Sequence, residues 1–135
     1  ARKEEIFTSE KIIVTRKCAI PTFSYADFSG RGYTRQTNQI KPDLVAPGVN
    51  ILAATPGGGK SRRTGTSFAT PFVTGSAALM MEWGIINGND VYLYGEKIKA
   101  YLIKGARRVR GFDIWPNPQM GWGTLCVKDS IPLVR

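Results

Sequence analysis

The stretch that decides the fold reads Gly65-Thr66-Ser67-Phe68-Ala69-Thr70-Pro71-Phe72-Val73-Thr74-Gly75. It leads into a run dominated by Ala, Leu and Met, which are residue types that favour helix. Pro71 falls in the first turn of such a helix, where the N–H groups have no intrahelical acceptor and proline is tolerated. The sequence therefore predicts a helix over about residues 67 to 84, with Thr66 or Ser67 at the N-cap.

Apolar residues lie around nearly the whole circumference of this predicted helix, which is typical of a helix that is buried on most sides. Gly75 in its interior then indicates close approach of a neighbouring element. The apolar positions are Phe72, Val73, Ala77, Leu79, Met80 and Trp83.

A serine at the start of this helix is a candidate nucleophile. Its hydroxyl is exposed at the helix N-terminus, where free N–H groups and the positive end of the helix dipole face any anion that forms beside it. That environment suits attack on a carbonyl group. For an isolated Thr-Ser pair before a helix, N-capping alone would explain Ser67, so the surrounding sequence has to decide.

Two short apolar runs precede the helix, at Leu44 to Ala46 and Val49 to Ala54, and they are typical of strands joined by a tight turn. A Gly-rich, basic loop is expected from Gly57 to Arg63. Its first residues end in Gly-Lys-Ser like a phosphate-binding loop, but Ala54 stands where that pattern needs glycine and no helix starts at Ser61. Nucleotide binding is therefore rejected.

The N-terminal quarter is less regular. We expect a strand at Lys11 to Thr15, a second strand at Phe23 to Phe28, a turn over residues 29–32 and a surface loop from Tyr33 to Gln39.

After the candidate helix, the sequence predicts a turn at Asn87 to Asp90 and an amphipathic helix from Gly95 to about Ala106. An irregular tail follows and ends in a short strand at Leu125 to Val127. The amphipathic helix is expected to bury Ile98, Tyr101 and Leu102 and to turn Lys97, Lys99 and Lys104 outward.

Composition sets the limits within which a function must fit. The chain has 135 residues with 42% hydrophobic content and a formal charge of +9, from 19 Lys and Arg against 10 Asp and Glu. The length suits one modest domain, and no apolar run reaches the roughly 20 residues of a membrane span. The basic residues are scattered and not interleaved with aromatics, so nucleic acid is an unfavoured partner. Cys18 and Cys126 are expected to be buried free thiols.

The most informative count is that of histidine, which is zero. Histidine is the side chain whose ordinary pKa lies near neutrality. Any serine nucleophile in this chain therefore lacks the usual general base within the same sequence. No residues are assigned to a metal or a cofactor.

Three motifs together resemble the subtilases, the subtilisin-like serine proteases of peptidase family S8. Residues 65–71 resemble the Gly-Thr-Ser-x-Ala-x-Pro nucleophile motif. Residues 40–51 resemble the strand pair that precedes it, and Phe28-Ser29-Gly30-Arg31-Gly32 resembles the Phe-Ser-x-Arg-Gly segment further upstream. The Gly-x-Gly at residues 121–123 resembles the family's pattern near the end of the domain. Within this family, the sequence most resembles the bacterial, clostridial-type branch.

The resemblance implies a role for each residue that matches the motif. Ser67 corresponds to the nucleophile, with its backbone N–H as one oxyanion donor, and Thr66 corresponds to the oxyanion-supporting threonine. Gly65, Ala69 and Pro71 complete the nucleophile motif. One departure is Phe72, because the family usually has a structural histidine at this position. The family's chain order is Asp, His, Ser, so the Asp, the His and the oxyanion asparagine are expected upstream of this sequence.

The implied fold is the α/β three-layer subtilisin-like fold, here only its C-terminal portion, with a partial parallel sheet and packed helices. Residues 23–135 are assigned to that portion of the catalytic domain, and residues 1–22 form an N-terminal segment with one strand. The implied activity is serine endopeptidase, with the isolated chain inactive. Implied partners are a polypeptide substrate and the missing N-terminal part of the same domain, with no membrane partner. Self-association through an exposed strand edge is also expected.

The resemblance assigns no cofactor to this chain and leaves calcium as an option for the parent domain only. The charged N-terminus has no apolar segment behind it, so no signal peptide is expected in this chain. Family likeness suggests a bacterial protein that is secreted or cell-associated. Two rival functions stay open at this point: an inactive pseudo-protease or interaction module with the subtilase fold, and a basic domain that binds acidic polymers through Lys60 to Arg63 and Arg107 to Arg110.

Overall fold

The computed structural model describes residues 25–132. The expected strand at Lys11 to Thr15 and the thiol of Cys18 lie outside these residues. The elements in chain order are β1 (Gly32–Tyr33), β2 (Ile40–Lys41), β3 (Ile51–Thr55), β4 (Gly59–Arg63), α1 (Thr66–Met81), the π-helical turn η1 (Glu82–Ile86), α2 (Gly95–Lys104) and α3 (Val127–Ser130).

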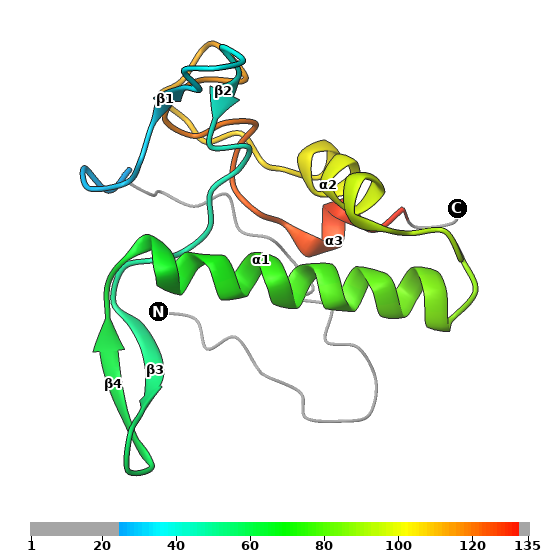
Figure 1. The fold of residues 1–135 in the computed structure, drawn as a ribbon, viewed down its shortest axis with the longest axis horizontal. Coiled ribbons are helices and arrows are strands. Elements are labelled where there is room, and N and C mark those ends of the chain that lie inside the picture. Colours follow the sequence, from blue (N-terminus) through cyan, green and yellow to red (C-terminus); the bar gives the residue numbers. More distant parts are fainter. Residues whose placement is uncertain (1–24, 133–135) are drawn as a thin grey trace.

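Helix α1 is the axis of the structure (Figure 1). A hairpin of β3 and β4 extends from its N-terminal end, while α2 and α3 lie along one side of it (Figure 1). β3 pairs with β4 in antiparallel register, from Ile51 opposite Arg63 to Thr55 opposite Gly59. The expected strand at Val49 to Ala54 is thus confirmed in its main part. The loop expected from Gly57 to Arg63 is wrong, because most of it is β4.

The helix predicted from the nucleophile motif is confirmed and begins one residue earlier than expected, at Thr66. The expected N-cap is wrong: Gly65 occupies that position, and no side chain caps the helix. Glycine suits this position because the backbone adopts a φ of 155°, a conformation that residues with a Cβ rarely take. Thr66 and Ser67 are consequently the first two residues of α1.

Burial of α1 is much less complete than its composition predicts. Within α1 only Ser76 and Met80 are buried, and Phe72 is 42% exposed. A Cβ added at Gly75 would meet no atom of the described residues within 4 Å, so residues 25–132 do not provide the expected close neighbour. The reason is that the described chain packs against only one side of the helix.

That packed side carries the core. Met80 of α1 clusters with Leu93, with Ile98 and Leu102 of α2, and with Ile131 beyond α3. The prediction for α2 is confirmed: Ile98 and Leu102 are buried, Tyr101 is partly buried, and the lysines of the helix are exposed. The turn expected at Asn87 to Asp90 is also present.

The C-terminal tail returns to the segment before the hairpin. The Val45 N–H donates to the Gly123 carbonyl oxygen at 3.0 Å, and the Leu125 N–H donates to the Val45 carbonyl oxygen at 2.8 Å. Val45 and Thr124 therefore form a parallel bridge. A Cβ at Gly121 would collide with the carbonyl oxygens of Pro42 and Asp43, so only glycine allows this approach.

Three predicted strands differ from the structure. Leu44 to Ala46 is reduced to the single bridge at Val45. Leu125 to Val127 is not a strand, since α3 begins at Val127. Within Phe23 to Phe28, the described residues from Tyr25 onward form a bend and turn, in which the Ser29 N–H donates to the Ala26 carbonyl oxygen at 2.9 Å.

The expectation for Cys126 is half right. It is buried, with 2% of its surface exposed, but it is disulfide-bonded and not a free thiol. Spacing along the sequence could not reveal this, because a disulfide depends on proximity in the fold and not on separation in the chain.

Candidate active site

The candidate nucleophile lies where the hairpin meets α1. Ser67 is the second residue of the helix and its side chain is exposed. Within residues 25–132 no hydrogen bond to the Ser67 hydroxyl is recorded, whereas Ser76 in the same helix donates to the Phe72 carbonyl oxygen at 2.6 Å. The two serines of α1 thus differ: the Ser76 hydroxyl is hydrogen-bonded to a carbonyl of its own helix, whereas the Ser67 side chain is exposed.

Backbone N–H groups next to Ser67 also lack hydrogen-bond acceptors among the described residues. The Phe68 N–H bonds to the Gly65 carbonyl oxygen at 3.0 Å. The N–H groups of Thr66 and Ser67 have no such acceptor among the described residues. Unpaired N–H groups at a helix N-terminus, together with the helix dipole, attract negative charge. An oxyanion formed next to Ser67 would therefore be stabilised.

Close packing of two glycines fixes the position of this turn. The Gly65 N–H donates to the Gly48 carbonyl oxygen at 2.8 Å. A Cβ at Gly48 would lie 2.9 Å from the Gly65 carbonyl oxygen and 3.3 Å from the Cβ of Ala69. Only glycine at residue 48 lets the Pro-Gly turn come this close to the start of α1, and Ala69 supplies the small side chain on the helix side.

A second contact lies directly beside the first. The Asn50 N–H donates to the Thr64 hydroxyl oxygen at 3.0 Å, and the Arg62 guanidinium donates to the Asn50 carbonyl oxygen at 3.0 Å. Asn50 has a φ of 56°, a left-handed conformation that asparagine tolerates better than most residues. These bonds tie the two ends of the hairpin together immediately before the nucleophile motif.

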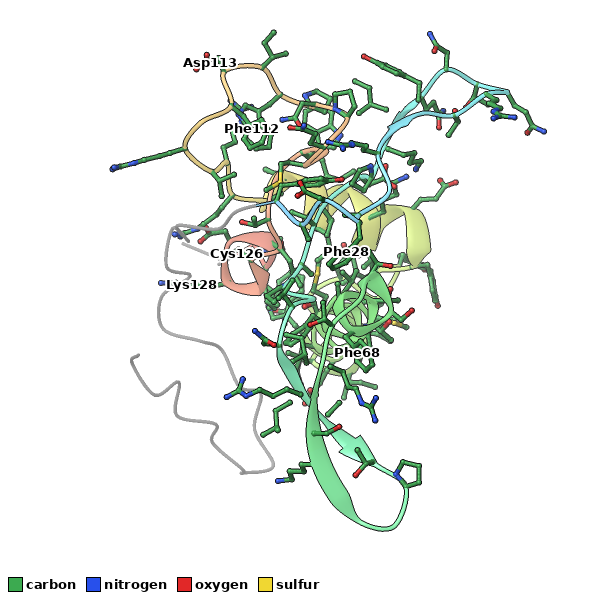
Figure 2. The ribbon with its side chains drawn as sticks, turned by 90° about the vertical axis from the view of Figure 1, so that its left-hand side faces the viewer. Phe28, Phe68, Phe112, Asp113, Cys126 and Lys128 are labelled. Carbon is green, nitrogen blue, oxygen red and sulfur yellow. The ribbon has the colours of Figure 1, made fainter. Side chains whose placement is uncertain are left out.

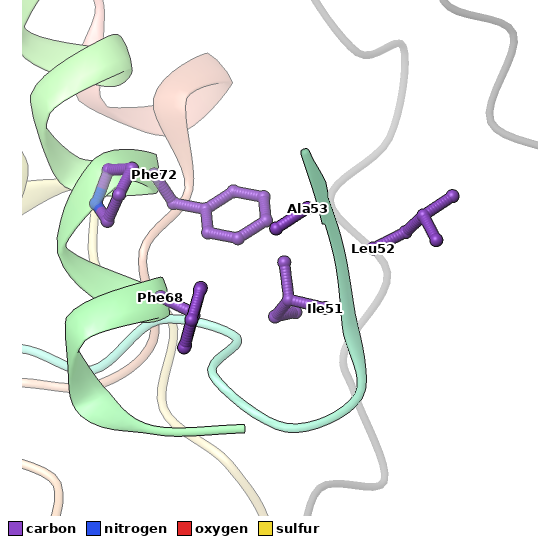
Figure 3. Close-up of a pocket in the computed structure, with 6 residues that line it drawn as sticks. Ile51, Leu52, Ala53, Phe68 and Phe72 are labelled. Atoms are coloured by element: carbon purple, nitrogen blue, oxygen red, sulfur yellow. The ribbon is translucent and has the colours of Figure 1, made fainter. Parts of the chain in front are cut away.

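An apolar groove of about 290 Å³ lies between β3 and the first two turns of α1. Figure 3 shows Ile51 and Ala53 of β3 pointing toward Phe68 and Phe72 of α1, while Leu52 points to the other side of the strand. The remaining lining residue is Pro71, a member of the nucleophile motif.

The segment that contains the site carries charges of a single sign. Between Asp43 and Glu82 the sequence contains no acidic residue, and its charged residues there are Lys60, Arg62 and Arg63. Within residues 25–132 no group of His, Cys, Asp and Glu is arranged to hold a metal ion. None of the helices in those residues has the length and apolarity that a bilayer crossing requires.

Asp43 is the acidic residue that most closely precedes Ser67 in the sequence, and it is paired with two lysines. It accepts a hydrogen bond from Lys41 at 2.6 Å and forms an ion pair with Lys99 at 3.1 Å. Partial burial favours its neutral form, but the hydrogen bonds from Lys41 and Lys99 outweigh this and lower the pKa of Asp43. Asp43 therefore joins β2 to α2 through its two lysine partners, away from the Ser67 turn.

Sequence reasoning placed Gly65, Thr66, Ser67, Ala69 and Pro71 in one motif, and the structure brings all five into the first turns of α1 and its N-cap. It did not single out Gly48 or Thr64. Pro47-Gly48 lies in the tight turn predicted between the two apolar runs and within the segment 40–51 that resembles the family's strand pair, but a glycine after proline is also a signal for close backbone approach. Thr64 gave no signal, because its hydrogen-bond partner is fourteen residues away.

The family follows from comparison with known proteins. The model of the Subtilase family, Peptidase_S8, matches residues 19–123, so the chain belongs to the subtilases, a family of serine proteases.

Among curated relatives, the chain is 31% identical over 118 residues to the minor extracellular protease Vpr of Bacillus subtilis, covering 78% of this chain and 13% of Vpr. It is 40% identical over 88 residues to pyrolysin of Pyrococcus furiosus, covering 64% of this chain and 6% of pyrolysin.

Solved structures give the same result. The CspB protease of Clostridium perfringens matches with a TM-score of 0.73 and 51% identity, over 78% of this chain and 22% of that chain. The prenylagaramide maturation protease PagA matches with a TM-score of 0.56 and 36% identity, over 65% of this chain and 31% of that chain. The expected subtilisin-like fold and the likeness to a clostridial subtilase are confirmed. The expected partial parallel sheet differs: among residues 25–132 the two sheets, β1–β2 and β3–β4, are antiparallel, and parallel pairing is limited to the bridge between Val45 and Thr124. The chain spans less than a third of these two proteins.

Proposed function

We propose that this chain carries the nucleophile of a serine endopeptidase and that Ser67 is that nucleophile. The observation that supports this best is the exposed Ser67 hydroxyl at the N-terminus of α1, beside backbone N–H groups with no acceptor among the described residues. In the proposed reaction, the Ser67 Oγ attacks the peptide carbonyl carbon while a histidine takes its proton. The proton then passes to the departing amine, and water hydrolyses the acyl-enzyme.

Two neighbouring groups are proposed to assist this step. The Ser67 N–H donates to the oxygen that becomes negatively charged, which is the largest single contribution in many such sites. Thr66 supports the same oxygen. Gly48 and Gly65 act only indirectly, because they hold the turn in position.

The base has to come from another part of the protease, because the chain contains no histidine. We propose that residues 23–135 form the C-terminal portion of a catalytic domain whose upstream portion supplies the Asp and the His. The uncovered side of α1 supports this view: Phe72 is 42% exposed, although it lies on a largely apolar helix. The upstream portion is proposed to pack against that side.

The substrate follows from the family and is a polypeptide. The hairpin offers a further contact surface, since β3 and β4 form a two-stranded sheet with unpaired outer edges among the described residues. In the absence of the upstream portion, these edges are proposed to pair between chains.

The test is covalent labelling. A fluorophosphonate probe reacts with an activated serine, so it should label the complete catalytic domain, meaning this chain joined to the upstream segment that carries the Asp and His. Peptide mapping should locate the label on Ser67, and the isolated chain should stay unlabelled because its serine is not activated.

Two variants make the result specific. Ser67→Ala should abolish labelling, whereas Ser76→Ala should leave the label in place, because the Ser76 hydroxyl is bonded to its own helix. If the complete domain folds but does not react with the probe, the pseudo-protease alternative is correct and the nucleophile assignment is wrong.

A further inference from the structure

Three cations stand on the strand that leads into the candidate nucleophile. Lys60, Arg62 and Arg63 belong to β4 and are exposed, and no ion pair to any of them is recorded among the described residues. The second basic cluster, at Arg107 to Arg110, differs in two respects. Arg107 is paired with Asp129. The loop that follows this cluster carries Phe112 and Asp113 at the end of the molecule opposite the hairpin (Figure 2).

The three cations lie on different faces of the hairpin. Directly opposed residues of an antiparallel pair share a face, and successive residues alternate. Arg63 is opposite Ile51, which points toward α1 (Figure 3). Arg62 is opposite Leu52, which points away, and Lys60 lies on the same face as Arg62. Arg63 is therefore the one cation of β4 on the face that adjoins Phe68 and the Ser67 turn.

Hydrogen bonding also distinguishes Arg63. Its Nε donates to the Ser61 hydroxyl oxygen at 3.0 Å, which orients the guanidinium along the strand. Both Nη groups have no recorded partner among the described residues. In Arg62, by contrast, Nη1 donates to the Asn50 carbonyl oxygen. A guanidinium with two free Nη groups matches the geometry of a carboxylate.

Distance along the chain limits where such a carboxylate can lie. Arg63 precedes Ser67 by four residues, so their Cα atoms are at most about 14 Å apart. An extended substrate advances about 3.3 Å per residue. A side chain that meets Arg63 therefore belongs to a residue within about four positions of the bond that Ser67 attacks.

We infer that Arg63 selects a polypeptide substrate with an aspartate or glutamate within four residues of the scissile bond. The inference rests on the proposed function, since it needs Ser67 as the point of attack. Among residues 25–132 no ion pair joins Arg63 to a carboxylate, and the segment between Asp43 and Glu82 contains no acidic residue. A neutral residue at that substrate position forfeits a charge-assisted hydrogen bond.

The experiment uses the complete catalytic domain and peptide pairs that differ only by Asp or Asn, placed in turn at each position within four residues of the cleaved bond. At one position, the Asp peptide should have a kcat/KM about fivefold higher, expressed mainly in KM, as suits an exposed ion pair. Arg63→Gln should remove this ratio, and Arg63→Glu should reverse it. Lys60→Gln is the matched control and should keep it, because it removes an equal charge from the other face of the same strand. Raising the salt concentration should shrink the ratio.

Binding separates the failure of this inference from the failure of the proposed function. Ser67→Ala protein should bind a fluorescent Asp peptide more tightly than the Asn peptide, and the additional Arg63→Gln substitution should remove the difference. If Ser67 is not labelled by the fluorophosphonate but this difference is present, the nucleophile assignment fails and the acidic selectivity stands. If Ser67 is labelled and no position distinguishes Asp from Asn, the selectivity is refuted. Arg63-dependent binding of a single-stranded oligonucleotide more tightly than of the Asp peptide would also refute it, in favour of a general polyanion site.

Discussion

The two halves of α1 belong to one helix and have opposite surroundings. Its C-terminal half contributes Ser76 and Met80 to the buried interior, and Gly84 of the following π-helical turn is buried as well. Its N-terminal half carries Ser67 and the exposed ring of Phe72, and the hairpin extends from this end (Figure 1). The comparison shows that the described residues pack the far end of the helix, whereas at the site end Phe72 keeps an exposed apolar surface.

The largest effect of a substitution is expected at the packed end. Leu102 is 4% exposed and belongs to the core cluster, so Leu102→Ala should lower the free energy of unfolding by about 2 to 4 kcal/mol through lost burial and the cavity left behind. Leu52→Ala is the matched control, because Leu52 is 60% exposed, and it should change the free energy by less than about 0.5 kcal/mol. Urea titration followed by tryptophan fluorescence measures both. Equal losses at the two sites would contradict the contrast between the two ends.

Gly75 tests the same contrast from the other direction, because it lies on the uncovered side of α1. A Cβ there meets no atom of residues 25–132 within 4 Å, so Gly75→Ala should stabilise this chain by about 0.5 to 1 kcal/mol through helix propensity alone. In the complete catalytic domain the same substitution should instead destabilise, because the upstream portion is proposed to pack on this side. Thermal unfolding of both proteins provides the test. A stabilising effect in both would show that nothing covers this part of α1.

The smallest expected effect concerns Asp43, which links β2 and α2 through Lys41 and Lys99. Its pKa is lowered in the folded state, so the unfolded chain binds this proton more readily, and the stabilisation is present above the ordinary carboxyl pKa and lost as the pH falls through the lowered value. All three side chains are partly exposed, which limits the contribution to less than about 1 kcal/mol. Asp43→Asn should flatten this part of the pH–stability curve. An unchanged slope would mean that the pairs contribute nothing.

The sequence could predict those features that depend on local chemistry. The run of Ala, Leu and Met that follows Pro71 was enough to predict α1, and the spacing of Ile98 and Leu102 was enough to predict the buried face of α2. In both cases the decisive information lies within a few neighbouring residues. Ser67 could be proposed as the nucleophile for the same reason, because its motif is contiguous.

Features that depend on distant partners could not be predicted. The Gly57 to Arg63 segment looks like a loop by composition, since glycine and charged residues are poor strand formers, yet it pairs with β3. The hairpin overrides propensity because its ends are held together at Gly48 and Gly65. The burial of α1 was overestimated because hydrophobicity reports what a helix can bury and not what this chain provides to cover it.

The bonds at the base of the hairpin have a consequence for how such a site changes over time. Gly65 to Gly48 and Asn50 to Thr64 close the excursion between residues 50 and 64 at its neck, so the position of Ser67 does not depend on what happens at the tip. Closing a longer loop costs little additional entropy. Insertions, deletions or charge substitutions beyond the neck should therefore leave the position of Ser67 unchanged. The hairpin can then vary in sequence and alter substrate preference without changes at the nucleophile.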